Sequence, residues 1–303
     1  MIVRDKNNSF KLLFAWSGTI LPTVLPALLI VVFISAVLVY LSSHQFFTVP
    51  AVPAIGFTIF GVILSIFLSF RNNACYDRWW EGRKLWGALI ANSRHLSRDS
   101  HVLNQERRNI LMYRVMLFTH LLRDRLRAQH QSFEFYHDKV EFSPTELKSL
   151  KQKINASQFV LEAIQKDLVL ALRSGEISDI IYNSLNQHIV ELGNIQAGCD
   201  RILSTPLPFS YSVLLHRTVY CFCFILPFSL EASLGIWTPI LVGLIAYLFL
   251  GLDALSSQIE EPFGLQDNDL PLNSIVRLIE REMSESLEVK LPPAIQPTHN
   301  NLT

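Results

Sequence analysis

Long uncharged apolar runs set the strongest constraint on what this chain can fold into. Residues 19–41 contain no Asp, Glu, Lys or Arg, and residues 235–255 contain only Asp253. About 20 consecutive apolar residues are needed to cross a bilayer as an α-helix, so both runs are long enough to span one. The sequence therefore predicts an integral membrane protein.

Two further apolar runs are less complete. Residues 54–70 form a shorter run, but a helix there can extend at either end. Residues 206–230 are interrupted by Arg217, which leaves a full span and a half-span or buried helix both open. The sequence predicts an all-α membrane protein with four apolar membrane-embedded helices.

The charged residues lie almost entirely outside these runs. Only 17% of the 303 residues are charged and the formal net charge is zero, so no electrostatic case exists for a nucleic-acid partner. Between the runs, Leu111, Val115, Phe118 and Leu122 recur at helical spacing among charged neighbours. A helical cytoplasmic domain is predicted for this stretch.

The predicted organisation follows from these boundaries. It comprises a cytoplasmic N-terminal segment (1–18), the first two spans (19–71), the cytoplasmic helical domain (72–205), the third and fourth spans (206–256), a cytoplasmic C-terminal helical segment (257–290) and a disordered proline-rich tail (291–303).

The distribution of basic residues predicts the orientation. The 42–55 connection contains no charged residue, whereas Lys and Arg precede the first span and follow the second. Loops rich in Lys and Arg stay in the cytoplasm. Both termini are therefore predicted to be cytoplasmic, in a multi-pass protein of the cell inner (plasma) membrane.

Signatures of catalysis are missing from the sequence. No GxxxxGK or GxGxxG motif is present, and no two histidines lie three or four residues apart. Cys221 and Cys223 lie in an apolar run, where packing is the usual role of cysteine. No enzyme activity, cofactor or metal site is predicted.

The run "FGVILSIFLSFRNNACYDRWWEGR" at 60–83 passes from apolar to charged residues without a proline. It carries two adjacent stripes at four-residue spacing. Small residues form the first, which suits close helix packing: Gly61, Ser65 and Ser69. Apolar residues form the second: Val62, Ile66 and Phe70. Periodicity alone leaves open whether this second stripe packs on lipid and protein or lines a pore axis.

Two charges fall inside the predicted spans. Arg217 lies early in a helix that enters from the cytoplasm, and Asp253 lies late in one that returns to it, so antiparallel neighbours place them at similar depth. A lone charge in the membrane is unfavourable by about 2.5–3.5 kcal/mol. An intramembrane ion pair is predicted, with snorkelling of each side chain to the interface as the alternative.

Two motifs resemble a known family. "FRNNACYDRWWEGRKLWG" at 70–87 and "IEEPFG" at 259–264 are similar to signatures of the bestrophins, particularly the bacterial branch, and the hydropathy layout matches apart from the tail. The resemblance implies a homopentameric ion channel around one central pore. It also implies an apolar neck at Val62, Ile66 and Phe70, and a cytoplasmic aperture at Ile180.

This sequence departs from the pattern of the family at one site. Animal members carry a calcium clasp after the Pro-Phe-Gly motif, but here Gln266 stands where a carboxylate is expected, while Asp269 and Asp267 remain. Calcium prefers six to eight oxygen ligands, several of them charged. Calcium gating is not predicted, and Glu260 and Glu261 are interpreted as a polar boundary to the last span.

An apolar neck does not select the sign of an ion. On resemblance alone, the prediction leans to monovalent cations such as sodium, with a chloride-type anion channel as the alternative. A membrane-anchored interaction or scaffold protein without conduction is the alternative from another class. The expected partners are further copies of the chain, membrane lipids and the permeating ions.

Overall fold

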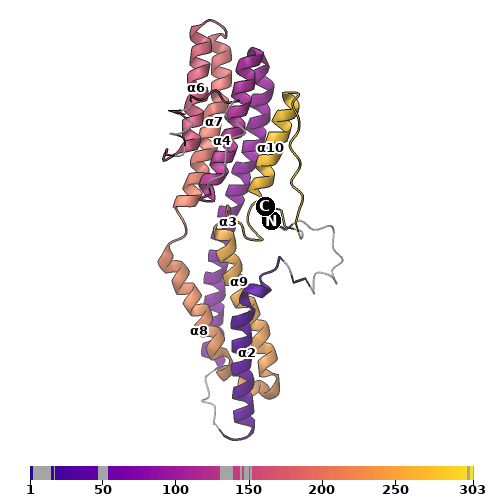
Figure 1. Cartoon of the computed structure of the whole chain (residues 1–303). Coiled ribbons are helices and arrows are strands. Elements are labelled where there is room, and N and C mark those ends of the chain that lie inside the picture. Colours follow the sequence, from indigo (N-terminus) through magenta and orange to yellow (C-terminus); the bar gives the residue numbers. More distant parts are fainter. Residues whose placement is uncertain are drawn as a thin grey trace.

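The computed structural model describes residues 1–2, 15–16, 18–46, 54–129, 139–143, 145–146, 150, 152–298 and 301–302. Within these residues every regular element is a helix, and the β-pairing consists of isolated bridges near the chain ends. The molecule is elongated, with apolar helices at one end and a more polar helical bundle at the other (Figure 1). The predicted all-helical class is confirmed.

The apolar end is built from α2 (Leu21–Ser43), the first part of α3 (Ala54–Asp99), α8 (Phe209–Leu234) and α9 (Thr238–Glu260). Three helical segments are long and apolar enough to cross a membrane: 21–43, 55–102 and 209–260. The third segment turns back at η3 (Gly235–Trp237), where Gly235 adopts a φ of 52°, so that α8 and α9 lie side by side.

The core of this end is continuous across all four helices. Its buried members are apolar side chains that face one another: Val24 and Val31 on α2, Leu64 and Leu68 on α3, Val219, Phe222 and Cys223 on α8, and Val242, Ala246 and Leu250 on α9.

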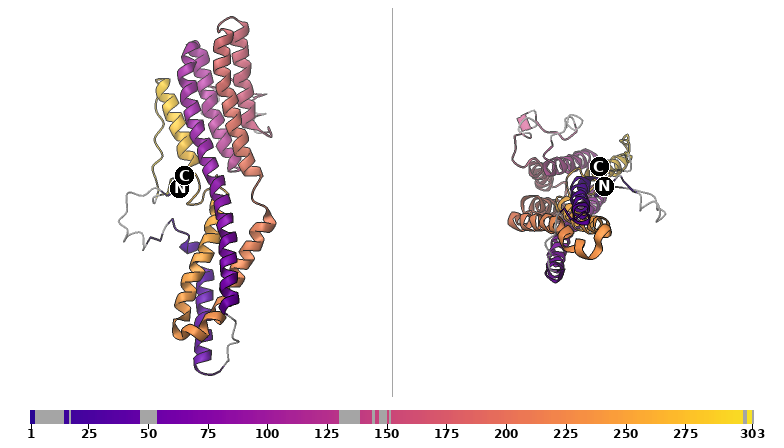
Figure 2. Two further views of the ribbon diagram at one scale, coloured as in Figure 1. Left: turned by 180° about the vertical axis from the view of Figure 1, so that it is seen from behind. Right: turned by 90° about the horizontal axis from the view of Figure 1, so that it is seen from below.

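Helix α3 joins the two ends of the molecule. It runs for 46 residues without a proline, which corresponds to about 69 Å at 1.5 Å per residue. Figure 2 (left) shows this helix passing unbroken from the apolar end into the bundle. Because the backbone is continuous, the helical register of the apolar half fixes which side chains share a face in the polar half.

The polar bundle packs the second half of α3 with η1 (Ser100–Val102), α4 (Gln105–Leu126), α6 (Ala156–Arg173), α7 (Asp179–Ser204) and α10 (Leu272–Ser286). The side chains of Asn104, Asn155 and Ser178 cap α4, α6 and α7, each accepting a backbone N–H three residues on. A second core fills this bundle and includes Trp86, Leu89, Met112, Phe118, Leu122 and Leu185.

Part of the C-terminal tail that was predicted to be disordered lies within the described residues. The structure describes residues 291–298, which run alongside α10. Arg281 Nη1 donates to the Pro292 carbonyl at 2.7 Å, and Arg277 Nη1 donates to the Pro293 carbonyl at 3.3 Å. Proline has no N–H to donate but retains its carbonyl, so a proline-rich segment can still be held by arginine donors.

Candidate functional site

The apolar half of α3 has one covered face and one uncovered face. Leu64 and Leu68 are buried against the neighbouring helices. Val62, Ile66 and Phe70 remain 55%, 49% and 61% exposed in the single subunit. At about 100° per residue, Val62 and Ile66 lie about 160° around the helix from Leu64. The structure thus places the predicted neck residues on the side of α3 that its own subunit leaves open.

The predicted small-residue stripe does not act as one surface within the subunit. A Cβ added to Gly61 would lie 3.3 Å from the Phe222 ring of α8, so this glycine permits a close helix approach. Ser65 and Ser69 are exposed, and Ser65 Oγ donates to the Gly61 carbonyl at 2.7 Å. Gly61 is thus the member of the stripe for which a close approach to α8 is observed.

This close approach gives a measurable expectation. Gly61→Leu should lower the free energy of unfolding by about 1–3 kcal/mol, because the new side chain collides with Phe222 in a packed core. Gly56→Leu is the matched control on the same helix, since no atom lies within 4 Å of a Cβ built there. Unfolding of the detergent-solubilised protein measures both. Equal stability of the two variants would contradict the proposed contact.

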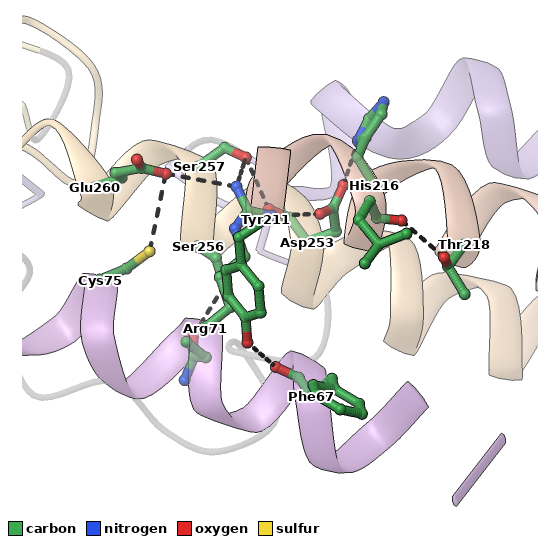
Figure 3. A network of polar contacts seen from close by, with 12 residues as sticks. Phe67, Arg71, Cys75, Tyr211, His216, Thr218, Asp253, Ser256, Ser257 and Glu260 are labelled. Atoms are coloured by element: carbon green, nitrogen blue, oxygen red, sulfur yellow. Dashed lines mark hydrogen bonds and ion pairs between the residues drawn. The ribbon is translucent and has the colours of Figure 1, made fainter. Parts of the chain in front are cut away.

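At the end of the apolar half, α3 carries a buried arginine. Arg71 is 3% exposed and points at α9 (Figure 3). Its Nη1 lies 2.5 Å from Asp253 Oδ1, its Nη2 donates to Ser257 Oγ at 3.0 Å, and Glu260 Oε2 lies 3.5 Å away. Two acidic side chains therefore supply the opposite charge that this buried guanidinium requires.

The predicted pair between Arg217 and Asp253 is wrong. The second carboxylate oxygen of Asp253 contacts His216 Nδ1 at 2.7 Å (Figure 3). Arg217 is exposed and has no ion pair within the described part of the chain. One residue turns the direction of a side chain by about 100°, so His216 faces α9 and Arg217 does not.

The sequence held a signal for the true partner. Leu64, Leu68 and Arg71 follow the i, i+4, i+7 spacing of one helix face, and the first two are apolar core residues. An arginine that continues a buried face needs a buried acid. Hydropathy alone does not reveal this role, because Arg71 directly follows the apolar run at 54–70.

Glu260, the last residue of α9, makes polar contacts with α3 and with the α7–α8 connection. Its Oε1 accepts the Leu207 backbone N–H at 3.2 Å, and its Oε2 lies 4.0 Å from Cys75 Sγ. Arg78 Nε donates to the Glu260 carbonyl at 3.1 Å, and Arg78 also donates to the carbonyls of Ile202 and Thr205. These contacts tie α3 to the α7–α8 connection and to the end of α9.

The predicted aperture residue lies at the far end of the bundle. Ile180 is the second residue of α7, next to the α6–α7 turn, which lies at the end of the molecule away from the apolar helices (Figure 1). Its side chain is 83% exposed. A large apolar side chain this exposed on a polar bundle is available to a second copy of the chain or to a passing ion.

The loop after the Pro-Phe-Gly motif holds its acidic residues by hydrogen bonds. Asp269 Oδ2 accepts the Gln266 backbone N–H at 2.7 Å, and Asp267 Oδ1 accepts Asn301 Nδ2 at 2.8 Å. Among the described residues, no three His, Cys, Asp or Glu side chains gather in a way that could hold a metal ion.

Burial gives Asp269 an unusual titration. Desolvation raises the pKa of the Asp269 carboxyl from 3.8 to about 6, against the lowering effect of the Gln266 hydrogen bond. Since the folded-state pKa is raised, the folded chain binds more protons than the unfolded chain between about pH 4 and pH 6. The contribution of this group to stability is therefore complete below about pH 4 and is lost as the pH rises through 6.

Asp269→Asn tests this linkage. The difference in free energy of unfolding between the variant and the wild type should shift in favour of the variant as the pH rises from about 4.5 to 7. The reason is that a neutral amide carries no desolvation penalty. Thermal unfolding of both proteins across this pH range gives the difference, in which the other titrating groups cancel. Parallel pH profiles would contradict the buried-carboxyl assignment.

The fold and the site define a class of protein: a helical membrane protein with several spans, whose longest helix presents an open apolar stripe in its membrane-spanning part. The family model described as Bacterial/Fungal Bestrophin protein matches residues 1–285. The chain belongs to this family, whose members are ion channels and not enzymes.

Relatives and solved structures agree with this assignment. The voltage-dependent anion channel-forming protein YneE of Salmonella typhi is 38% identical over 301 residues, covering 97% of this chain and 96% of its own. Its counterpart in Escherichia coli K12 is 36% identical over 310 residues and covers both chains fully. A crystal structure of a bacterial bestrophin homologue from Klebsiella pneumoniae superposes with a TM-score of 0.77 at 31% identity, over 88% of this chain and 99% of that one.

Proposed function

We propose that five copies of this chain form a channel for monovalent ions in the cell inner membrane, with the pore lined by α3. The observation that carries the proposal is the uncovered stripe of Val62, Ile66 and Phe70, opposite the face that Leu64 and Leu68 bury. Around a symmetry axis, that open side would face the other copies. One continuous helix would then supply both the membrane neck and part of the cytoplasmic wall.

The chemistry of the stripe suits a gate. Three stacked apolar rings offer an ion no polar ligand in exchange for its hydration shell, so the neck would limit flow by excluding water. Ile180 would form a second apolar constriction at the far end of the bundle. Both assignments come from the family resemblance and are supported by the exposure of the four side chains.

Anions are the first candidate for the permeating ion, because the relatives are named as voltage-dependent anion channel-forming proteins. Cations such as sodium are the second candidate, as the resemblance suggested. The specific observation in their favour is Asp77, an exposed carboxylate on α3 that follows the apolar stripe.

A bilayer recording tests conduction and the sign of the ion together. The purified protein is inserted into a planar bilayer under a salt gradient, and the reversal potential is read. We expect single-channel currents, with the sign of the reversal potential naming the preferred ion. Absence of current from particles that contain five copies of the 34.6 kDa chain would favour the scaffold alternative.

Cysteine labelling tests the orientation. Cysteines placed at Ser43, the last residue of α2, and at Ser233, near the α8–α9 turn, should react with an impermeant maleimide added to intact cells in a background without native cysteines. A cysteine at Ser174, in the α6–α7 turn, should react only after the membrane is opened. Labelling of Ser174→Cys alone in intact cells would invert the proposed topology.

A further inference from the structure

Beyond the apolar stripe, α3 presents two carboxylates on the same side, Asp77 and Glu81, and Glu81 forms an ion pair with Arg201. Asp77 lies seven residues after Phe70, and seven residues return a helix to within about 20° of the same direction. Its side chain is exposed and makes no hydrogen bond or ion pair within the described part of the chain. Asp77 is therefore an uncompensated charge about 10 Å along the helix axis from Phe70.

The other charged side chains of α3 near Asp77 form ion pairs or donate to backbone carbonyls of neighbouring helices. Arg71 is neutralised by Asp253 and Glu260, and Arg78 points at backbone carbonyls of the α7–α8 connection and the end of α9. Glu81 forms an ion pair with Arg201. These groups add little net charge to the open side of α3.

The next two basic residues along α3 are Arg83 and Lys84. Arg83 stacks its guanidinium on the Trp80 ring at 5.2 Å. Lys84 is exposed on the side of α3 that carries Asp77, seven residues beyond it and about 21 Å from Phe70 along the axis. The Debye length is about 10 Å at 0.1 M salt, so the Lys84 charge is more strongly screened at the end of the stripe than the Asp77 charge.

We propose that Asp77 is a charge-selectivity residue of this channel. In the pentamer, its five copies would form a carboxylate ring just beyond the apolar neck, which attracts cations and repels anions at that mouth. This inference rests on the proposed function. It predicts the direction in which Asp77 biases permeation, whichever ion the whole channel prefers.

Asp77→Asn removes the charge and keeps the size of the side chain. The ratio of cation to anion permeability, read from reversal potentials at about 0.1 M salt, should fall by about threefold or more. The effect should shrink at 1 M salt, where the Debye length is about 3 Å. A merely structural role for Asp77 would not produce this dependence on salt.

Three controls surround this variant. Asp77→Glu should keep the wild-type ratio, because the charge stays. Glu162→Gln removes an exposed carboxylate of α6 that has no hydrogen bond or ion pair within the described residues, and it should change nothing. Lys84→Gln should shift the ratio the opposite way from Asp77→Asn, and by less.

Chemical modification covers the case in which Asp77→Asn does not assemble. Asp77→Cys, in a background with Cys221 replaced by Ser, is modified after assembly with a sulfonate or a trimethylammonium thiol reagent. The negative reagent should raise the permeability ratio of cation to anion and the positive reagent should lower it. Equal ratios after both reagents, or an unchanged ratio in conducting Asp77→Asn, would overturn the proposal. A wild type without current would instead overturn the channel function on which it rests.

Discussion

Arg71→Ala is expected to lower the free energy of unfolding by about 3–5 kcal/mol. The substitution leaves Asp253, which is 3% exposed, as a buried carboxylate without its guanidinium partner. The loss of a buried partner is among the most destabilising single changes a core can suffer. Denaturant unfolding of the solubilised protein gives the size of the effect.

A double-mutant cycle identifies the partner. Arg71→Ala combined with Asp253→Ala should be less destabilising than the sum of the single changes, with a coupling free energy of about 0.5–3 kcal/mol. Arg217→Ala is the matched control one residue from His216, and its effect should stay within about 0.5 kcal/mol and add to that of Asp253→Ala. Coupling of Asp253 to Arg217 and not to Arg71 would contradict the structure.

Ile66→Ala and Phe70→Ala are expected to increase ion flow, by about twofold or more in single-channel conductance or open probability. Each substitution removes several heavy atoms from every copy around the proposed neck, which widens the passage and lowers the barrier to wetting. Because both side chains are exposed in the single subunit, their truncation should leave its own core intact. Bilayer recordings of variants with verified assembly measure the change.

Phe67→Ala is the matched control for this prediction. Phe67 lies at the same depth of α3, but its side chain points about 100° away from that of Ile66. Its truncation should leave conductance unchanged.

Ser65→Leu and Ser69→Leu should impair assembly more than permeation, if these small residues meet neighbouring subunits. Unchanged flux in well-assembled Ile66→Ala and Phe70→Ala would show that the stripe is ordinary packing.

The tail and the small-residue stripe show how local reasoning reached its limit. Proline-rich composition predicted a disordered tail from residue 291, and it could not show that two arginines on α10 donate to the carbonyls of Pro292 and Pro293. Four-residue spacing correctly put Gly61, Ser65 and Ser69 on neighbouring positions of one helix side. The place where Phe222 crosses α3 decides that Gly61 is in close contact.

The sequence by itself determined the properties that depend on local composition and spacing. The apolar runs require helices of membrane length, because a backbone in lipid must satisfy its own hydrogen bonds. The two motifs at 70–87 and 259–264 indicated the bestrophin family, which the family comparison confirms. The absence of proline from 54–99 allowed α3 to continue from the apolar end into the bundle.

Only the tertiary structure decided which side chains meet. Arg71 directly follows one apolar run and Arg217 interrupts another, and hydropathy alone does not tell which of them meets a buried acid. Arg71 is buried against Asp253 because α3 packs on α9 with its Leu64, Leu68 and Arg71 face inward. The register of α8 brings His216, itself more than half exposed, to Asp253 and leaves Arg217 without an ion pair among the described residues. Successive side chains such as His216 and Arg217 differ in direction by about 100° around the helix. Which of them meets Asp253 is set by the packing of whole helices against one another.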